Sequence, residues 1–316
     1  MKQPLCDALF LYHAGTTAED DDSLGPFYIV HCVFIPILSM TALIFNSITI
    51  QAIRKTPAFS QNLRTLLLSL AISDLGVGLL VQPFYFWLLF KKSQHSSAGN
   101  SSVATCTAFV YLASVFSTGS FLGVTTLSID RFLAVYLHLR YQEFVTNNRV
   151  VSVAISNWVL SAIVSTIVAV RIPQRIPYMI LGALGIFCLL FIAFLYFKIY
   201  LCVRHHQKQI RCLQVQQEAA NVANVKKSAT GSFYVYLVFS LCYLPQFSSF
   251  VIIAVMGFNT AVKTFSISAI TFVFLNSSLN PFVYCWKMRH IRHAIMNTLE
   301  NLCQHNCHIQ SRGENV

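Results

Sequence analysis

The sequence predicts an all-α fold, a seven-transmembrane helix bundle, and two observations carry this prediction. Seven long segments are almost free of charge, and the chain is 55% apolar and 10% charged, whereas a typical soluble domain is about 25% charged. A helix rises about 1.5 Å per residue, so about 20 residues cross the ~30 Å hydrocarbon core of a bilayer. The predicted spans are Phe27–Ile53, Thr65–Phe90, Val103–Ile129, Val150–Val170, Ile176–Phe197, Ser228–Val262 and Thr264–Trp286.

The distribution of basic residues predicts how these spans are oriented. If the N-terminus lies outside, sixteen of the 22 Lys and Arg residues fall in cytosolic segments and six fall outside. This is the positive-inside bias, so we expect an outside N-terminus and a cytosolic C-terminus. The net charge of +11 then serves topology and contact with anionic membrane lipids and cytosolic partners, and no nucleic-acid partner is expected.

The segments that flank and connect the spans have simple expectations. Residues 1–26 form an outside tail, 27–286 the membrane domain, and 287–316 an interfacial helix with a short cytosolic tail. Lys287–Leu302 is amphipathic, with Met288, Ile291 and Ile295 on one face, which suits a helix lying in the membrane interface. Residues 207–225 lack Pro and Gly, so helices five and six are expected to continue into the cytosol.

One acidic residue, Asp74, lies deep inside a span. A charge at this depth costs about 2.5–3.5 kcal/mol on insertion scales, so Asp74 should face the bundle interior and have a partner. Carboxylate, amide and hydroxyl oxygens without a nearby basic residue suit a sodium ion or a proton. The alternative is a neutral Asp74 within a hydrogen-bond network. The other polar candidates inside the spans are Asn46, Ser120, Asn276, Ser277 and Asn280.

Two prolines are expected to kink their helices. Pro245 lies in the sixth span and Pro281 in the seventh. Proline has no N–H and clashes with the carbonyl four residues earlier, which frees the carbonyls of Leu241 and Ser277. Each kink is either a hinge or a static bend.

An acid and an arginine, Asp130 and Arg131, end the third span at the predicted cytosolic boundary. Arg131 can pair with Asp130 or reach toward helix six. As an isolated feature, it can also be a simple interface anchor.

Taken together, these motifs resemble those of the rhodopsin-like (class A) G-protein-coupled receptors, in order and in register with the spans. The resemblance extends over about Phe27–Cys303. The motifs are Asn46, Ser73-Asp74, Cys106, Asp130-Arg131-Phe132, Trp158, Tyr196, Cys242-Tyr243-Leu244-Pro245 and Asn280-Pro281-Val283-Tyr284. The resemblance implies a plasma-membrane receptor that binds an extracellular ligand and activates a heterotrimeric G protein, with arrestin as a further partner.

The resemblance also implies roles for individual residues. Asp74, Ser120, Asn276 and Asn280 match the family's sodium pocket. Arg131 and Leu139 match G-protein contacts. Agonist binding is expected to shift the population toward a state in which helix six moves outward, which opens a cleft for a G-protein helix. The expected activation residues are Asp130, Arg131, Tyr196, Phe121, Phe239, Pro245, Pro281 and Tyr284.

Departures from the family pattern narrow the expected ligand. Ala113 replaces the aspartate of amine receptors and Phe274 the lysine of opsins, which argues against a monoamine and against retinal. Tyr243 replaces a tryptophan, Cys188 a proline, and Val225 an acid that often holds Arg131. The chain most resembles the cluster of melanocortin, cannabinoid, lysolipid and adenosine receptors, although the binding residues of those receptors do not carry over.

Helical position predicts a mostly apolar outer cavity without a charged anchor. An apolar or lipid-like ligand, or the apolar part of a peptide, is favoured there; alternatively, these side chains pack against each other and no ligand binds. The expected ligand-binding residues are Phe84, Ala113, Ser114, Ser117, Tyr243, Gln246, Phe247, Phe250, Ile270 and Phe274, with Leu88, Ile180 and Leu184 beside them.

Several residues are candidates for covalent modification. Asn100 lies in an outside Asn-Ser-Ser sequon and is expected to carry a glycan. Cys303 and Cys307 follow the interfacial helix and suit palmitoylation, the alternative being idle thiols. The family pairs the cysteine at the position of Cys106 with a second-loop cysteine that is absent here, so Cys6 or Cys32 is expected to replace it.

No nucleophile–base arrangement, phosphate-binding loop or zinc-hydrolase motif is visible in the sequence, so we expect no enzyme and no cofactor beyond a sodium ion at Asp74. The rival hypothesis is a seven-helix ion-coupled transporter with Asp74 as its relay. Transporters usually show internal repeats and several intramembrane acids, whereas this chain has a single acid and no repeat.

Overall fold

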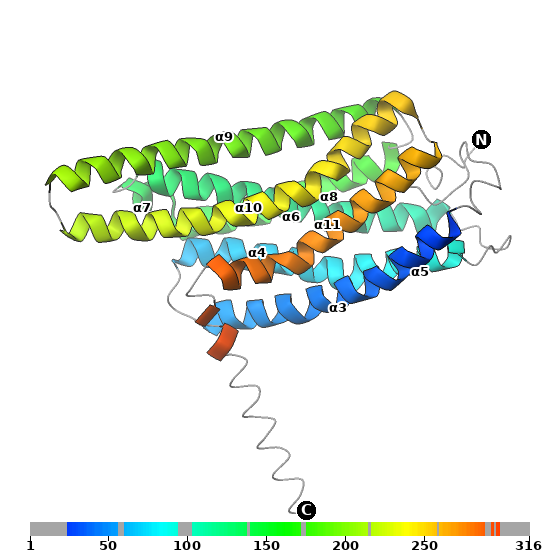
Figure 1. Cartoon of the computed structure of the whole chain (residues 1–316), viewed down its shortest axis with the longest axis horizontal. Helices are drawn as coiled ribbons and strands as arrows, with labels where there is room; N and C mark the ends of the chain where they lie inside the picture. Colours follow the sequence, from blue (N-terminus) through cyan, green and yellow to red (C-terminus); the bar gives the residue numbers. More distant parts are fainter. Residues whose placement is uncertain are drawn as a thin grey trace, which may run out of the picture.

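The computed structural model describes residues 24–55, 60–93, 103–137, 140–171, 175–213, 216–257, 259–287, 292–293 and 295–297. Seven helical rods in these residues are long and apolar enough to cross a membrane, which confirms the predicted fold class. They lie side by side, and α9 and α10 project beyond the others at the end away from the start of α3 (Figure 1). The helices are α3 (Gly25–Lys55), α4 (Gln61–Gly76), α5 (Gln82–Ser93), α6 (Val103–Leu137), α7 (Tyr141–Phe144), α8 (Asn147–Arg171), α9 (Arg175–Leu213), α10 (Gln216–Met256) and α11 (Thr260–Lys287).

The bundle has apolar residues on its outside and polar residues within. On α3, the side chains of Ile29, Phe34 and Ile37 are each more than half exposed. A water-soluble monomer rarely exposes a continuous apolar surface of this size. Asn46 and Asp74, in contrast, are fully buried. This arrangement suits a hydrocarbon solvent, in which polar groups must find partners inside the protein.

The second span contains a π-helical turn, η1 (Val77–Val81), between α4 and α5. Pro83 explains this turn, because it has no N–H and its ring would clash with the Leu79 carbonyl of a regular helix. The N–H of Gln82 donates to the carbonyl of Val77, five residues earlier, which widens the turn. Pro36 lies within α3. With Pro245 and Pro281, prolines therefore lie inside four of the described spans, two more than expected.

The boundary between the sixth and seventh helices lies earlier than predicted. α10 ends at Met256, Gly257 adopts a φ of 73°, and its N–H donates to the Ile253 carbonyl over 2.9 Å. Asn259 Oδ1 then accepts from the N–H of Val262 over 2.9 Å, which caps the start of α11. A left-handed glycine followed by an asparagine cap stops one helix and starts the next. Lys263, predicted to lie in a loop, is instead buried in the first turn of α11.

The predicted extensions of helices five and six beyond their apolar spans are present. α9 continues to Leu213 and α10 begins at Gln216. These two helices pack against each other along their length, and α10 also packs on α11. The predicted interfacial helix at 287–302 lies largely outside the described residues.

Candidate functional site

A buried polar cluster joins α3, α4 and α11 at the middle of the bundle. Asn280 Nδ2 donates to Asp74 Oδ2 over 2.6 Å, and both side chains are fully buried. Asn46 Nδ2 donates to the Ser277 carbonyl over 2.9 Å. Because Pro281 frees that carbonyl from its helical partner, Asn46 satisfies the acceptor that the proline leaves behind. The hydrogen bond to the Ser277 carbonyl therefore connects α3 with α11.

The same cluster contains oxygen atoms suited to a hard cation. Asp74 Oδ1, Asn276 Oδ1 and Asn280 Oδ1 are buried and have no hydrogen-bond partner in the part of the chain that the structure describes. Ser120 is buried on α6, and its hydroxyl lies close to the Asp74 carboxyl group. Carboxylate, amide and hydroxyl oxygens are hard ligands. The donor set predicted from the sequence is thus compatible with sodium.

An aromatic cluster surrounds the Pro245 kink of α10. The ring of Phe239 stacks on Tyr243 with centroids 4.0 Å apart. Phe121 of α6 lies 5.8 Å from Phe239 and 5.4 Å from Phe247. The Tyr243 hydroxyl donates to the Ser117 carbonyl over 3.2 Å. These contacts hold both sides of the kink against α6.

The other end of α6 carries the Asp130–Arg131 pair. Both side chains are buried, and Arg131 Nε donates to Asp130 Oδ2 over 2.9 Å. The hydroxyl of Tyr141 in α7 donates to the second carboxylate oxygen over 2.6 Å. Burial and the Asp130 carboxylate raise the pKa of Tyr141 to about 12, so this hydroxyl remains a donor at neutral pH. Of the two arrangements predicted for Arg131, the structure therefore shows the local pairing with Asp130.

Two further predicted activation residues are buried tyrosines. The Tyr196 ring stacks on Tyr236 with centroids 5.2 Å apart, and its hydroxyl forms a 3.2 Å hydrogen bond with Ser128 of α6. Tyr284 is 1% exposed, and its hydroxyl has no hydrogen-bond partner among the residues described. Tyr196 is thus tied to α6 and α10, whereas the Tyr284 hydroxyl is an unsatisfied buried group.

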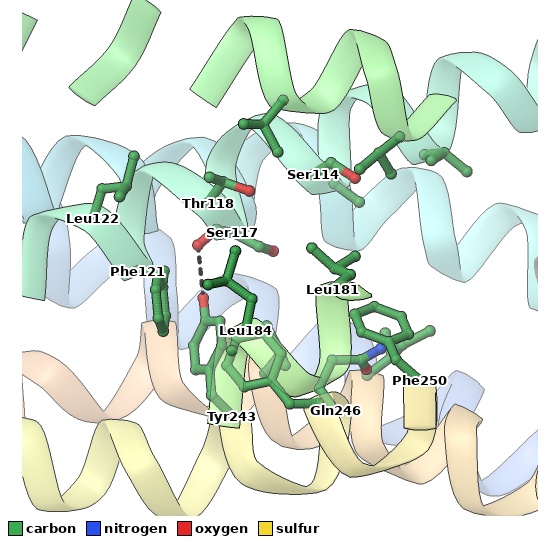
Figure 2. Close-up of a pocket in the computed structure, with 18 of the residues that line it drawn as sticks. Ser114, Ser117, Thr118, Phe121, Leu122, Leu181, Leu184, Tyr243, Gln246 and Phe250 are labelled. Carbon is green, nitrogen blue, oxygen red and sulfur yellow. Dashed lines mark hydrogen bonds between the residues drawn. The ribbon is translucent and has the colours of Figure 1, made fainter. Parts of the chain in front are cut away.

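A cavity of about 470 Å³ lies next to the aromatic cluster around Pro245, toward the end of the bundle at which α3 and α6 begin. This volume is within the usual range for small-molecule sites. Figure 2 shows Tyr243 and Phe121 at one end of the cavity and Phe250 at the other. The lining residues that the sequence predicted are Ala113, Ser114, Ser117, Leu184, Tyr243, Gln246, Phe247, Phe250, Ile270 and Phe274.

Three expected lining residues lie elsewhere. Phe84 packs against Phe109, with ring centroids 5.6 Å apart, and Leu88 is buried in the same core. Ile180 is 60% exposed on the outward face of α9. The π-helical turn before Pro83 rotates α5 relative to a regular helix, which explains the positions of Phe84 and Leu88.

The cavity also extends in a direction that the sequence did not predict, between α8 and α9. No polar residue marks this wall, so hydropathy gave no signal for it. At Gly185, an added Cβ would overlap the ring of Phe247, so this glycine allows α9 and α10 to approach closely. The additional lining residues are Phe109, Val110, Thr118, Phe121, Leu122, Leu160, Val164, Val168, Tyr178, Leu181, Gly185, Cys188 and Val273.

The cysteine prediction is settled in part. Cys106 is disulfide-bonded, and Cys32 is a free thiol. Cys32 is therefore not the partner, because its sulfur is unpaired inside the apolar first span. Cys6, the other predicted partner, lies outside the described residues, as do Leu139, Asn100, Cys303 and Cys307.

Comparison with known proteins gives consistent matches to one family. The family model described as "7 transmembrane receptor (rhodopsin family)" matches residues 45–177. The histamine H2 receptor of Cavia porcellus is 28% identical over 264 residues, which cover 77% of this chain and 72% of that receptor. The adenosine receptor A3 of Ovis aries is 22% identical over 294 residues, which cover 85% of this chain and 89% of that receptor.

These relatives do not single out a branch of the family. The adenosine receptor is one of the four receptor types that the sequence predicted, and the histamine receptor is not. The matched relatives are receptors, and the comparisons do not favour the transporter hypothesis. The seven membrane-spanning helices, the motifs in register and these matches show that the chain is similar to the seven-transmembrane receptors of the rhodopsin family.

Proposed function

We propose that this receptor acts at the plasma membrane, with its N-terminus outside and its C-terminus in the cytosol. It binds an extracellular ligand in the cavity and activates a heterotrimeric G protein by outward motion of α10. The observation that carries this proposal is that Phe121, Tyr243 and Phe247 belong both to the cavity lining and to the aromatic cluster around Pro245. A ligand therefore touches the hinge directly.

The coupling follows from these shared contacts. A ligand that displaces the Tyr243 ring also disturbs its stack on Phe239 and its hydrogen bond to Ser117. Both contacts favour the state in which α10 lies against α6. A ligand shifts the equilibrium only by its differential affinity for the two states, and a kinked helix has few backbone hydrogen bonds to break at the kink. The expected motion is rotation of the cytosolic part of α10 about Pro245.

At the cytosolic end, this motion would release the contacts of α10 with α9. Tyr196 stacks on Tyr236 there, and the buried Arg131 lies on the neighbouring face of α6. Separation of α10 from α6 opens a cleft with Arg131 at its floor, and an amphipathic helix of a G protein fits such a groove. Leu139 and Arg131 are the proposed contacts. Arrestin is proposed as a second partner for the same cleft.

The ligand class follows from the lining. Among the described lining residues there is no charged side chain, and the polar groups are the hydroxyls of Ser114, Ser117, Thr118, Tyr178 and Tyr243 and the amide of Gln246. A charged ligand would lose its hydration without gaining an ion pair. An apolar or lipid-like ligand, or an apolar peptide segment, is therefore favoured. Sodium at Asp74 and Asn280 is proposed to stabilise the resting packing of α4 against α11.

The decisive experiment measures guanine-nucleotide exchange on purified heterotrimers of each G-protein class, with the receptor in nanodiscs. The receptor should accelerate exchange on at least one class, alone or with lipids, peptides or nucleosides added. Arg131→Ala should abolish the acceleration while ligand binding remains. Lys55→Ala, which removes an exposed basic residue at the end of α3, is the matched control and should exchange normally. Absence of exchange on every heterotrimer would contradict the proposal.

A further inference from the structure

Two apolar stripes face each other across the cavity, one on α8 and one on α9. Residues four apart lie on one face of a helix, and the lining residues of α8 have this spacing. Those of α9 follow the matching spacing of three and four. We call this pair of stripes the α8–α9 seam. Its members are Leu160, Val164 and Val168 on α8 and Leu181, Leu184 and Cys188 on α9.

Two seam residues also belong to the outer surface of the bundle. Leu160 is 46% exposed and Leu184 is 56% exposed, which approaches the exposure of the outward-facing Ile163 and Phe187 on the same helices. Several lining residues on the other walls, such as Phe109, Tyr243 and Phe274, are almost completely buried. The wall at the seam is therefore open to the surface that faces the hydrocarbon.

The packing of the helices explains why this wall is open. α8 packs on α6 and α4, whereas α9 packs on α10 and α6. In the residues described, α8 and α9 make little direct contact with each other. Their positions are set by α6, and the space between their outer halves is left to the apolar side chains of the seam.

Compared with the seam, the cavity is more closed toward the end of the bundle at which α6 and α9 begin. The ring of Tyr178 on α9 lies 5.8 Å from that of Phe250 on α10. Phe109 of α6 is buried and stacks on Tyr85 of α5 at 5.4 Å. These aromatic contacts bridge neighbouring helices where the cavity meets the ends of the bundle. The seam is thus the opening that leads to the membrane.

The polar groups of the cavity indicate what the ligand carries at its head. Gln246 Oε1 is buried and accepts no hydrogen bond from any residue that the structure describes. Figure 2 shows Gln246 beside Phe250 on one side of the cavity and Ser114, Ser117 and Thr118 of α6 on the other. Burial without a donor is unfavourable for such an acceptor. A ligand with a neutral O–H or N–H donor would remove this penalty.

We propose that the ligand is a neutral lipid of the bilayer that enters sideways through the α8–α9 seam. Its apolar chain lies between Leu160 and Leu184, and its head group donates a hydrogen bond to Gln246. A peptide is excluded from this route because its backbone groups would lose water within the hydrocarbon. The inference deepens the proposed receptor function. The route of entry does not depend on that function, whereas the claim that the bound lipid is the signal rests on it.

Photolabelling in nanodiscs tests the proposal. The probe is a monoacylglycerol with a diazirine in its acyl chain, and labelled peptides of the full-length receptor are mapped by mass spectrometry. Labels should concentrate on the α8 and α9 stripes. Leu184→Trp fills the seam and should reduce labelling about tenfold, because overpacking an apolar gap blocks it. Phe187→Trp adds the same ring to the outward face of α9 and should leave labelling unchanged.

A second variant tests the head group. Gln246→Leu removes the acceptor and should weaken monoacylglycerol labelling about tenfold, as expected for a lost hydrogen bond with a buried partner. A diazirine-bearing alkane, which has no head group, should label Gln246→Leu and the native receptor equally. If both probes lose labelling equally, Gln246 is structural and the head-group assignment is wrong.

The outcomes separate the seam from receptor signalling. Val164→Phe on the facing stripe replaces Leu184→Trp if the tryptophan variant does not fold. Unchanged labelling in both seam variants, or an equal loss in Phe187→Trp, would overturn the proposed route. Nucleotide exchange is measured in the same nanodiscs. Exchange without seam labelling overturns the lipid route and leaves the receptor function standing, whereas seam labelling without exchange supports the route and contradicts signalling.

Discussion

The hydroxyl of Tyr243 donates a hydrogen bond to the carbonyl of Ser117, 3.2 Å away on the neighbouring helix. Tyr243 lies two residues before the Pro245 kink and stacks on Phe239, while Ser117 lines the cavity. One hydrogen bond therefore links the ligand site, the hinge of α10 and α6.

Tyr243→Phe should raise basal nucleotide exchange. The variant keeps the stacked ring and loses the hydrogen bond, whose net contribution is about 1 kcal/mol. This energy corresponds to about a fivefold shift in the equilibrium toward the open state. Basal exchange is measured at equal receptor density, with Tyr111→Phe, a tyrosine on the same helix as Ser117 but absent from the cavity lining, as the matched control. Unchanged exchange would mean that the bond does not restrain α10.

Asp74→Asn should abolish stabilisation of the receptor by sodium. A bound ion stabilises the folded state according to its concentration relative to its dissociation constant, and the neutral amide removes the charge that would hold it. The midpoint of thermal unfolding is compared in sodium chloride and in choline chloride at equal ionic strength. The midpoint of the native receptor should rise in sodium. Ser73→Ala, the adjacent residue whose hydroxyl bonds within α4, should respond as the native receptor does.

Much of the fold could be predicted because the membrane imposes a length and a polarity on each span. The start of the seventh helix was misplaced, since the apolar Val262 was assigned to the sixth span and Lys263 to the loop after it. The left-handed Gly257 and the Asn259 cap were usable signals that hydropathy averages away. The π-helical turn before Pro83 was likewise visible as a proline within an apolar run.

The ligand cavity was predictable where polar residues or family positions marked it. Ser114, Ser117 and Gln246 were found in this way. The α8 wall was missed because Leu160 and Val164 have the same composition as residues that face lipid. Whether an apolar residue of α8 faces lipid or a cavity depends on how closely α9 approaches, and this is a property of packing among three helices. No local sequence signal contains that information.

Asn46→Ala should destabilise the bundle without acting on the ligand site. Asn46 Nδ2 donates to Ser277, whose carbonyl Pro281 has freed, and removal of the amide leaves a buried acceptor unpaired. The expected cost is about 1–3 kcal/mol. The midpoint of thermal unfolding in detergent should fall by about 2–6 °C. Thr166→Val is the control, because its exposed hydroxyl bonds its own helix. A midpoint equal to that of the control would show that water satisfies Ser277.

Tyr141→Phe should loosen α7 while leaving α6 and α8 in place. The Tyr141 hydroxyl donates to Asp130 over 2.6 Å, and Asn62 of α4 donates to the same hydroxyl over 3.3 Å. The variant removes both bonds, although Asn62 retains its 2.8 Å bond to the Val145 carbonyl. Amide hydrogen exchange should therefore accelerate in 141–145, as expected for a segment with fewer restraints. Tyr136→Phe, which alters an exposed tyrosine near the end of α6, should not change it.

The pH dependence of the hydrogen bond between Tyr141 and Asp130 has a definite sign. Burial and the Asp130 carboxylate raise the pKa of Tyr141 to about 12, above the value of about 10 in an unfolded chain. The protonated hydroxyl is favoured in the folded state, so its stabilisation is fully present below about pH 10 and is lost as pH rises toward 12. The ratio of the amide exchange rate of Tyr141→Phe to that of the native receptor, taken at the same pH, should thus be constant from about pH 6 to 9. A difference that disappears within this range would show that another group, and not the Tyr141 hydroxyl, holds α7 against Asp130.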